Sequence, residues 1–156
     1  MAISALTVIR VQVAGIYLHA SLGKLAVQEW VDGSALYYWL LDPVFGATDF
    51  WRPLVMPILT SGIGVATLTW GTVALEFCIA LGLVLDKRWW RYILLAGIAL
   101  HVLIAVFMGL VSFGLAMAAA LILHLRPYDR PFTCGMPMQL PDTSCREPHI
   151  DAGHGL

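Results

Sequence analysis

Long apolar stretches with few charges dominate this chain, and their lengths predict membrane-spanning helices. The first stretch covers residues 3–23 and the second lies within residues 58–85. A helix needs about 20 apolar residues to cross the hydrocarbon core of a bilayer, so each stretch is long enough. A third stretch, residues 92–125, contains no Lys, Arg, Asp or Glu.

The third stretch is too long for one crossing. As a single helix it would measure about 50 Å at ~1.5 Å per residue, against a hydrocarbon core of ~30 Å. We therefore divide it near Gly109 to Gly114 into two short spans, residues 91–109 and 112–126. One long helix that runs past the membrane is the alternative. The pattern predicts an all-α fold: a multi-pass transmembrane helical bundle of about four spans, forming one domain over residues 1–126.

The segment between the first two spans mixes acidic and aromatic residues. Such a mixture is typical of the headgroup region of a bilayer. The sequence Asp32-Gly33-Ser34 predicts a turn followed by a short interfacial helix, which Asp42-Pro43 ends. We expect this aromatic segment to lie at the membrane surface.

Residues 127–156 are rich in Pro and Gly and show no periodicity, so we expect an irregular polar tail. The tail contains Cys134, Cys145, His149 and His154. Zinc-binding cysteines usually lie two to four residues apart, and this pair is much more widely spaced, so no metal is expected.

Composition supports a membrane protein. Of the 156 residues, 60% are hydrophobic and 12% charged, and the mean hydropathy is +0.81. The lipid bilayer is therefore the expected environment. The net charge of -1 argues against nucleic acid as a partner, because the positive charge that neutralises phosphates is missing.

Charge distribution predicts the orientation in the cell membrane. The turn at residues 86–91 carries three cations and two tryptophans, which is typical of a cytoplasmic loop. With four spans, the N-terminus, this turn and Arg126 lie on the same side. Both termini are therefore expected in the cytoplasm. The start of the chain has no cationic region before its apolar run, so no signal peptide is expected.

Polar residues recur along the first span. Arg10, Tyr17 and Lys24 are spaced seven residues apart, so they share one stripe of a helix. Gln12 and His19 form a second such pair. We expect the stripes to face protein, with Gln12 and His19 in hydrogen bonds between helices.

Three ionisable residues within or at the end of apolar stretches are the candidate catalytic residues: Lys24, Glu76 and His101. Ionisable groups in a membrane are costly and frequently functional. Lys24 can instead extend its amine to the headgroups, and His101 can be a hydrogen-bonded core residue. A lysine removed from water can serve as a base, whereas a nearby carboxylate would keep it charged. The two arrangements predict opposite titrations.

An ordered set of residues resembles the membrane core of the vitamin K-dependent gamma-carboxylase-like (HTTM) superfamily, in particular its small bacterial SdpB-like branch. The resemblance covers roughly residues 10–125 and rests on Tyr17, Lys24, Leu25, Trp30, Gly33, Glu76, His101, Gly109, Phe113 and Met117. It implies that Lys24 is the base, supported by Glu76 and His101. In the carboxylases this base works with a reduced quinone and oxygen.

Two departures from the family affect what the resemblance implies. The carboxylases have an asparagine where this chain has Ile104, which argues against their oxygen and quinone chemistry here; a quinone is implied by the resemblance alone, and the cofactor stays open. The chain also begins almost at the Lys24 helix and has about half of the family's helices. Two functions therefore remain: a membrane enzyme or enzyme subunit acting on a peptide or lipid-soluble substrate, and a non-catalytic subunit packed against a larger membrane complex.

Overall fold

The structure is a computed structural model that describes residues 2–125, and every regular element in that part of the chain is helical. The four longest helices are α1 (Ala2–Leu25), α5 (Gly62–Ala80), α6 (Lys87–Met108) and α7 (Val111–Leu125). The shorter elements are α2 (Gln28–Val31), α3 (Ala35–Leu41), α4 (Arg52–Leu59) and the 3-10 turn η1 (Leu81–Leu83). The predicted all-α class is confirmed. The predicted tail and its Cys and His residues lie outside the described residues.

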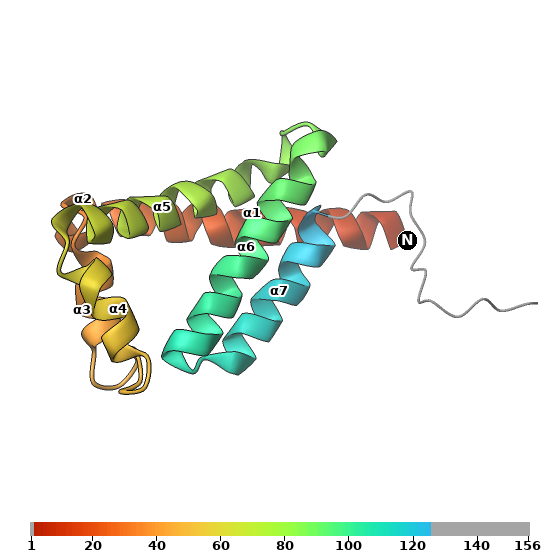
Figure 1. Cartoon of the computed structure of the whole chain (residues 1–156). Helices are drawn as coiled ribbons and strands as arrows, with labels where there is room; N and C mark the ends of the chain where they lie inside the picture. The colour runs from red at the N-terminus through yellow and green to blue at the C-terminus, as the bar shows by residue number, and fades with distance from the viewer. Residues whose placement is uncertain (1, 126–156) are drawn as a thin grey trace, which may run out of the picture.

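The long helices form two antiparallel pairs. Helices α1 and α5 lie side by side, and α6 and α7 form a hairpin that crosses them at an angle (Figure 1). Helix α7 also contacts α1, and α6 contacts α5. The start of α1, the α5–α6 turn and the end of α7 consequently meet at one end of the bundle. Lys24 lies at the opposite end, where α1 finishes.

Three of the helices are long and apolar enough to cross a membrane. They run from Ser4 to Leu25, from Gly62 to Leu83 and from Lys87 to Met108, so the chain is a membrane protein. Helix α7 is also apolar but has only 15 residues, fewer than the usual ~20. The fourth crossing and the position of the termini remain predictions.

The predicted interruption near Gly109 is present. Helix α6 ends at Met108, and Gly109 adopts a positive φ of 71°, a backbone conformation that glycine adopts at little cost. The chain then reverses into α7. The hairpin is tight because Gly114 passes close to α6: a Cβ there would lie 3.0 Å from the carbonyl oxygen of His101.

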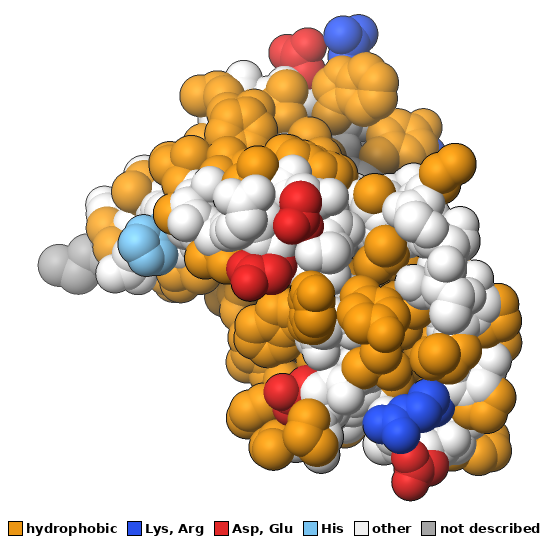
Figure 2. Space-filling model, turned by 90° about the vertical axis from the view of Figure 1, so that its left-hand side faces the viewer, with side chains coloured by type: hydrophobic (Ala, Val, Ile, Leu, Met, Phe, Trp, Pro, Cys, Tyr) orange, Lys and Arg blue, Asp and Glu red, His pale blue; other side chains and the backbone are white. Residues whose placement is uncertain are grey.

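The main core lies where the two helix pairs cross. Its buried members are Val13, Tyr17, Ile79, Ala80, Trp90, Leu121 and Leu125. Most other apolar side chains point outward, as expected when lipid replaces water around the bundle. Figure 2, which views the α2–α4 end, shows hydrophobic side chains over most of that face with acidic groups among them.

The segment from α2 to α4 is fastened to the bundle at both of its ends. Gly33, with a φ of 85°, lies against α5, where a Cβ would be 3.0 Å from the Cβ of Ala66. The Leu36 amide donates to Thr69 Oγ1 of α5 at 3.3 Å. Further on, the Thr48 amide donates to the carbonyl oxygen of Phe107 at 3.3 Å. The aromatic segment therefore has a defined position beside the ends of α1 and α6.

The two polar stripes on α1 have different surroundings. Arg10 and Tyr17 are buried, at 5% and 2% exposure, so that stripe faces protein as predicted. Gln12 and His19 are exposed and make no hydrogen bond to the other described residues. The expectation of hydrogen bonds between helices at Gln12 and His19 was wrong for this part of the chain, because α5 and α7 cover only one side of α1.

Candidate functional site

Lys24 and Glu76 form an ion pair between α1 and α5. Lys24 Nζ lies 2.6 Å from Glu76 Oε2, and the two side chains are 20% and 12% exposed. Lys24 is in the last turn of α1, where a cation also interacts favourably with the helix dipole. The lysine therefore binds a carboxylate of the neighbouring helix instead of extending freely into solvent.

Trp30 borders this ion pair. Lys24 Nζ lies 5.1 Å from the centre of the Trp30 ring, within the range of a cation–π interaction. Trp30 is 8% exposed and packs with Ala35 and Val73. Its ring is consequently a fixed wall beside the ammonium group.

His101 has a different partner. Its Nε2 shares a hydrogen bond of 2.7 Å with the hydroxyl of Tyr17, and both residues are buried. Its Nδ1 is buried and has no hydrogen-bond partner within residues 2–125. The ring of Phe113 packs edge-on against the imidazole, with 5.6 Å between ring centres. His101 is thus held by α1 and α7 inside the core.

Lys24 and Glu76 therefore form one pair and His101 forms another with Tyr17, so the three candidate residues do not meet in a single contact. Tyr17 and Lys24 are seven residues apart on α1, about 10 Å along the axis at ~1.5 Å per residue. Ser21 lies between them, is 1% exposed and donates to the carbonyl oxygen of Leu18.

Tyr17 is the member of the site that the sequence analysis did not single out as a functional residue. The signal was present in the seven-residue spacing that puts it on the same face as Lys24. The spacing does not identify the partner of Tyr17. His101 lies on α6 and bonds to Tyr17 of α1 only because the two helices cross in the folded protein.

Two cavities in the described part of the chain are lined by neither Lys24, Glu76 nor His101. Within residues 2–125 no group of three or more His, Cys, Asp or Glu side chains is arranged to hold a metal ion.

The turn that leads into the aromatic segment has its own electrostatic feature. Asp32 Oδ1 accepts from the hydroxyl and the amide of Ser34, at 2.6 and 2.9 Å. These two donors hold the pKa of the Asp32 carboxyl below its usual range. The carboxylate thereby stabilises the turn at Gly33 that orients α3.

Two curated proteins of Bacillus subtilis (strain 168) are similar to this chain. The uncharacterized protein YitO is 43% identical over 122 residues, which are 78% of this chain and 39% of YitO. The sporulation-delaying protein SdpB is 38% identical over 128 residues, 82% of this chain and 39% of SdpB. The chain thus spans about two-fifths of the length of each relative.

No family model matches the chain, and no solved structure matches it. The likeness to the two relatives is nevertheless extensive on the side of this chain. Over about four-fifths of its own length the chain is similar to parts of YitO and SdpB, and this supports the SdpB-like branch of the resemblance.

Proposed function

We propose that this membrane protein is an enzyme or enzyme subunit in which Lys24 and Glu76 perform acid–base chemistry on a peptide or lipid-soluble substrate. The observation that carries the proposal is the ion pair of 2.6 Å, whose side chains are 20% and 12% exposed. Keeping a charged pair at the edge of an apolar bundle is costly. Apolar side chains of similar size would hold α1 and α5 together without that cost.

The chemistry we propose is a proton transfer within the pair. In the resting state Lys24 is an ammonium and Glu76 a carboxylate. When a substrate excludes water, the proton moves from Nζ to Oε2, because two neutral groups are less costly in a low dielectric than two ions. The neutral amine can then accept a proton from the substrate, which makes Lys24 an ammonium again, and Glu76 gives its proton to the product, which restores the carboxylate.

His101 acts in this proposal through Tyr17 and is a positioning residue. Its hydrogen bond fixes the Tyr17 hydroxyl, which lies on the same face of α1 as Lys24. The wider HTTM resemblance, in which a lysine is the base, supports the same assignment for Lys24. Quinone chemistry is not part of the proposal.

The test compares two replacements of Lys24. Arginine keeps the positive charge and can pair with Glu76, but it does not release a proton near neutral pH. Methionine removes the charge. Membranes from the host with its own gene deleted, complemented with wild type, Lys24→Arg or Lys24→Met, are compared by mass spectrometry of their peptides and lipids.

We expect a product mass that wild type restores and that both variants lose, although Lys24→Arg reaches wild-type levels in the membrane. Lys87→Met is the matched control, since Lys87 is an exposed lysine at the other end of the bundle. Restoration of the product by Lys24→Arg would refute the acid–base role and leave Lys24 a structural ion-pair residue.

The second candidate is a non-catalytic accessory subunit of a larger membrane complex. It is favoured by the outer side of α5, where a Cβ added at Gly62 or Gly71 would meet no atom within 4 Å. The hydroxyls of Thr67 and Thr72 on this helix donate to its own backbone. A helix with small residues and satisfied hydroxyls allows another helix to approach closely.

About three-fifths of the length of YitO and of SdpB lies outside the match, which leaves enough chain in those proteins to cover the corresponding surface. The test for this chain is chemical cross-linking in host membranes from single cysteines at Gly71 and, as control, at Leu115 of α7, which is 68% exposed. The accessory role predicts one stoichiometric product from position 71 alone. Equal or no cross-linking at both positions would contradict it.

A further inference from the structure

A small cleft lies between α2 and α3, just after the end of α1. Its volume is about 190 Å³, and it is lined by Val27, Glu29, Trp30, Ala35, Tyr38 and Trp39. That volume corresponds to roughly six water molecules at ~30 Å³ each. It accommodates a small polar group of a ligand and excludes a folded partner.

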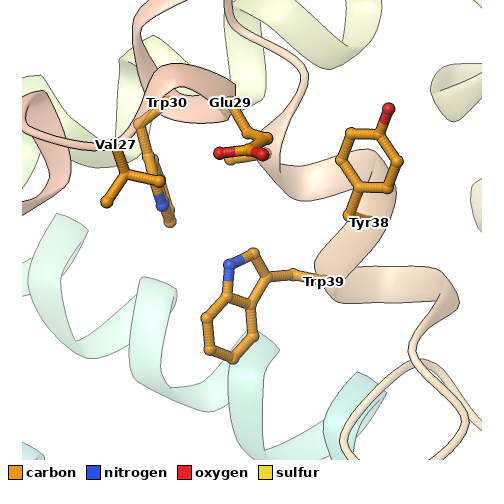
Figure 3. A pocket seen from close by; sticks show the side chains of 6 residues that line it. Val27, Glu29, Trp30, Tyr38 and Trp39 are labelled. Carbon is orange, nitrogen blue, oxygen red and sulfur yellow. The ribbon is translucent and has the colours of Figure 1, made fainter.

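The side chains around the cleft have a recognisable chemistry. Figure 3 shows the carboxylate of Glu29 and the indole rings of Trp30 and Trp39 directed at the same space, with the Tyr38 ring at its edge. Glu29 forms no ion pair or hydrogen bond within residues 2–125. The cleft therefore combines an available negative charge with several aromatic rings.

Aromatic rings around a carboxylate select cations. The faces of Trp and Tyr rings attract an ammonium group, most strongly one with alkyl substituents, and a carboxylate adds charge complementarity. Lys24, whose amine lies 5.1 Å from the centre of the Trp30 ring, does not cancel this effect because its charge is compensated by Glu76 at 2.6 Å. An anion would meet Glu29 with no cation to balance it.

The location of the cleft indicates the source of the ammonium group. Helix α1 is a membrane-spanning candidate that ends at Leu25, and the cleft begins two residues later at Val27. At that depth the headgroups of lipids are the most concentrated ligands. The aromatic residues that continue along the segment remain exposed, for example Trp39 at 48% and Phe50 at 80%, as is typical of the interface.

We propose that this cleft binds the ammonium group of a zwitterionic lipid headgroup. Glu29 provides the counter-charge, and Trp30 and Trp39 provide the aromatic walls. The site does not depend on the acid–base role of Lys24. An ordinary belt of interfacial aromatic residues would show neither the cleft nor the dependence on Glu29 that the proposal predicts.

The test is native mass spectrometry of the full chain in detergent, titrated with short-chain phosphatidylcholine or with phosphatidylglycerol of the same chain length. The headgroup of the first carries a quaternary ammonium and that of the second does not. We expect one phosphatidylcholine bound per chain, about tenfold more tightly than phosphatidylglycerol. Glu29→Gln and Trp39→Leu should each abolish the preference, whereas the protein remains folded by circular dichroism.

Two control variants lie on the same segment outside the cleft. Asp49→Asn removes an exposed acid, 97% exposed in its side chain, and Phe50→Leu removes an exposed aromatic ring. Both should retain the preference. The proposal is overturned if wild type shows no preference, if Glu29→Gln and Trp39→Leu keep it, or if Asp49→Asn loses it equally. Choline chloride binding as tightly as the lipid would overturn the assignment to a lipid headgroup.

Discussion

Replacing Glu76 by glutamine tests the Lys24–Glu76 ion pair between α1 and α5. The substitution keeps the size and shape of the side chain and removes its charge. Lys24 would then lie at the α1–α5 interface without a counter-ion, 2.6 Å from a neutral amide. We expect the variant to be less stable because the remaining ammonium has lost its partner and is only partly hydrated.

The size of the effect follows from how far the pair is buried. Removing one partner of a fully buried ion pair costs about 3–5 kcal/mol. Here the side chains are 20% and 12% exposed, so water relieves part of the loss, and we expect about 2–3 kcal/mol. The exposed Arg52–Asp49 pair, with N···O of 3.3 Å and exposures of 44% and 97%, should contribute less than ~1 kcal/mol.

The assay is reversible unfolding of the purified protein in mixed micelles with increasing SDS, followed by far-ultraviolet circular dichroism. Wild type, Glu76→Gln and the control Asp49→Asn are compared. The double variant Lys24→Met with Glu76→Gln should lose less than the sum of the two single variants, because no unpaired charge remains. A loss in Glu76→Gln equal to that in Asp49→Asn, or strict additivity in the double variant, would refute the reasoning.

Three further predictions concern Tyr17, Gly33 and Ser34. Tyr17→Phe should lower the free energy of unfolding by about 0.5–2 kcal/mol in the same assay, since it leaves a buried imidazole without its hydrogen bond; wild-type stability would contradict this. Gly33→Ala should destabilise by about 1–2 kcal/mol because of its positive φ and the close contact with α5, whereas Gly15→Ala, in open space on α1, should stabilise by about 0.5–1 kcal/mol. Ser34→Ala should raise the pKa of Asp32 toward its usual range in an NMR titration. Because that pKa is depressed in the folded protein, the Asp32 carboxylate stabilises the turn at pH values above the usual Asp pKa, and this contribution disappears as the pH falls through the folded pKa. An unchanged titration would contradict the role of Ser34.

The long helices were predictable from the sequence because membrane helices follow from local composition, whereas the short helices α2 and α4 were not predicted. Stretches of apolar residues must form helices in lipid, where each backbone group needs an internal partner. Gly109 likewise marked the reversal between α6 and α7, since its lack of a Cβ permits the positive φ of 71° found there. The class of the fold and the membrane environment therefore required no coordinates.

The candidate residues were only partly predictable. Lys24, Glu76 and His101 stood out because ionisable groups are rare in apolar stretches, but the sequence left open whether Lys24 would be paired or deprotonated. The exposed Gln12 and His19 show the limit of periodicity. A repeat of seven identifies a face of a helix but does not say whether another helix covers that face.

What the sequence by itself determined is the long helices, their membrane character and the presence of three ionisable groups in apolar stretches, where such groups are rare. Tertiary structure decided their partners: Lys24 with Glu76, and His101 with Tyr17. It also decided that Glu29 and Trp39 border one cleft. The physical reason is range, since helix formation depends on neighbours within a few residues, whereas each of these contacts depends on how separate elements cross and pack.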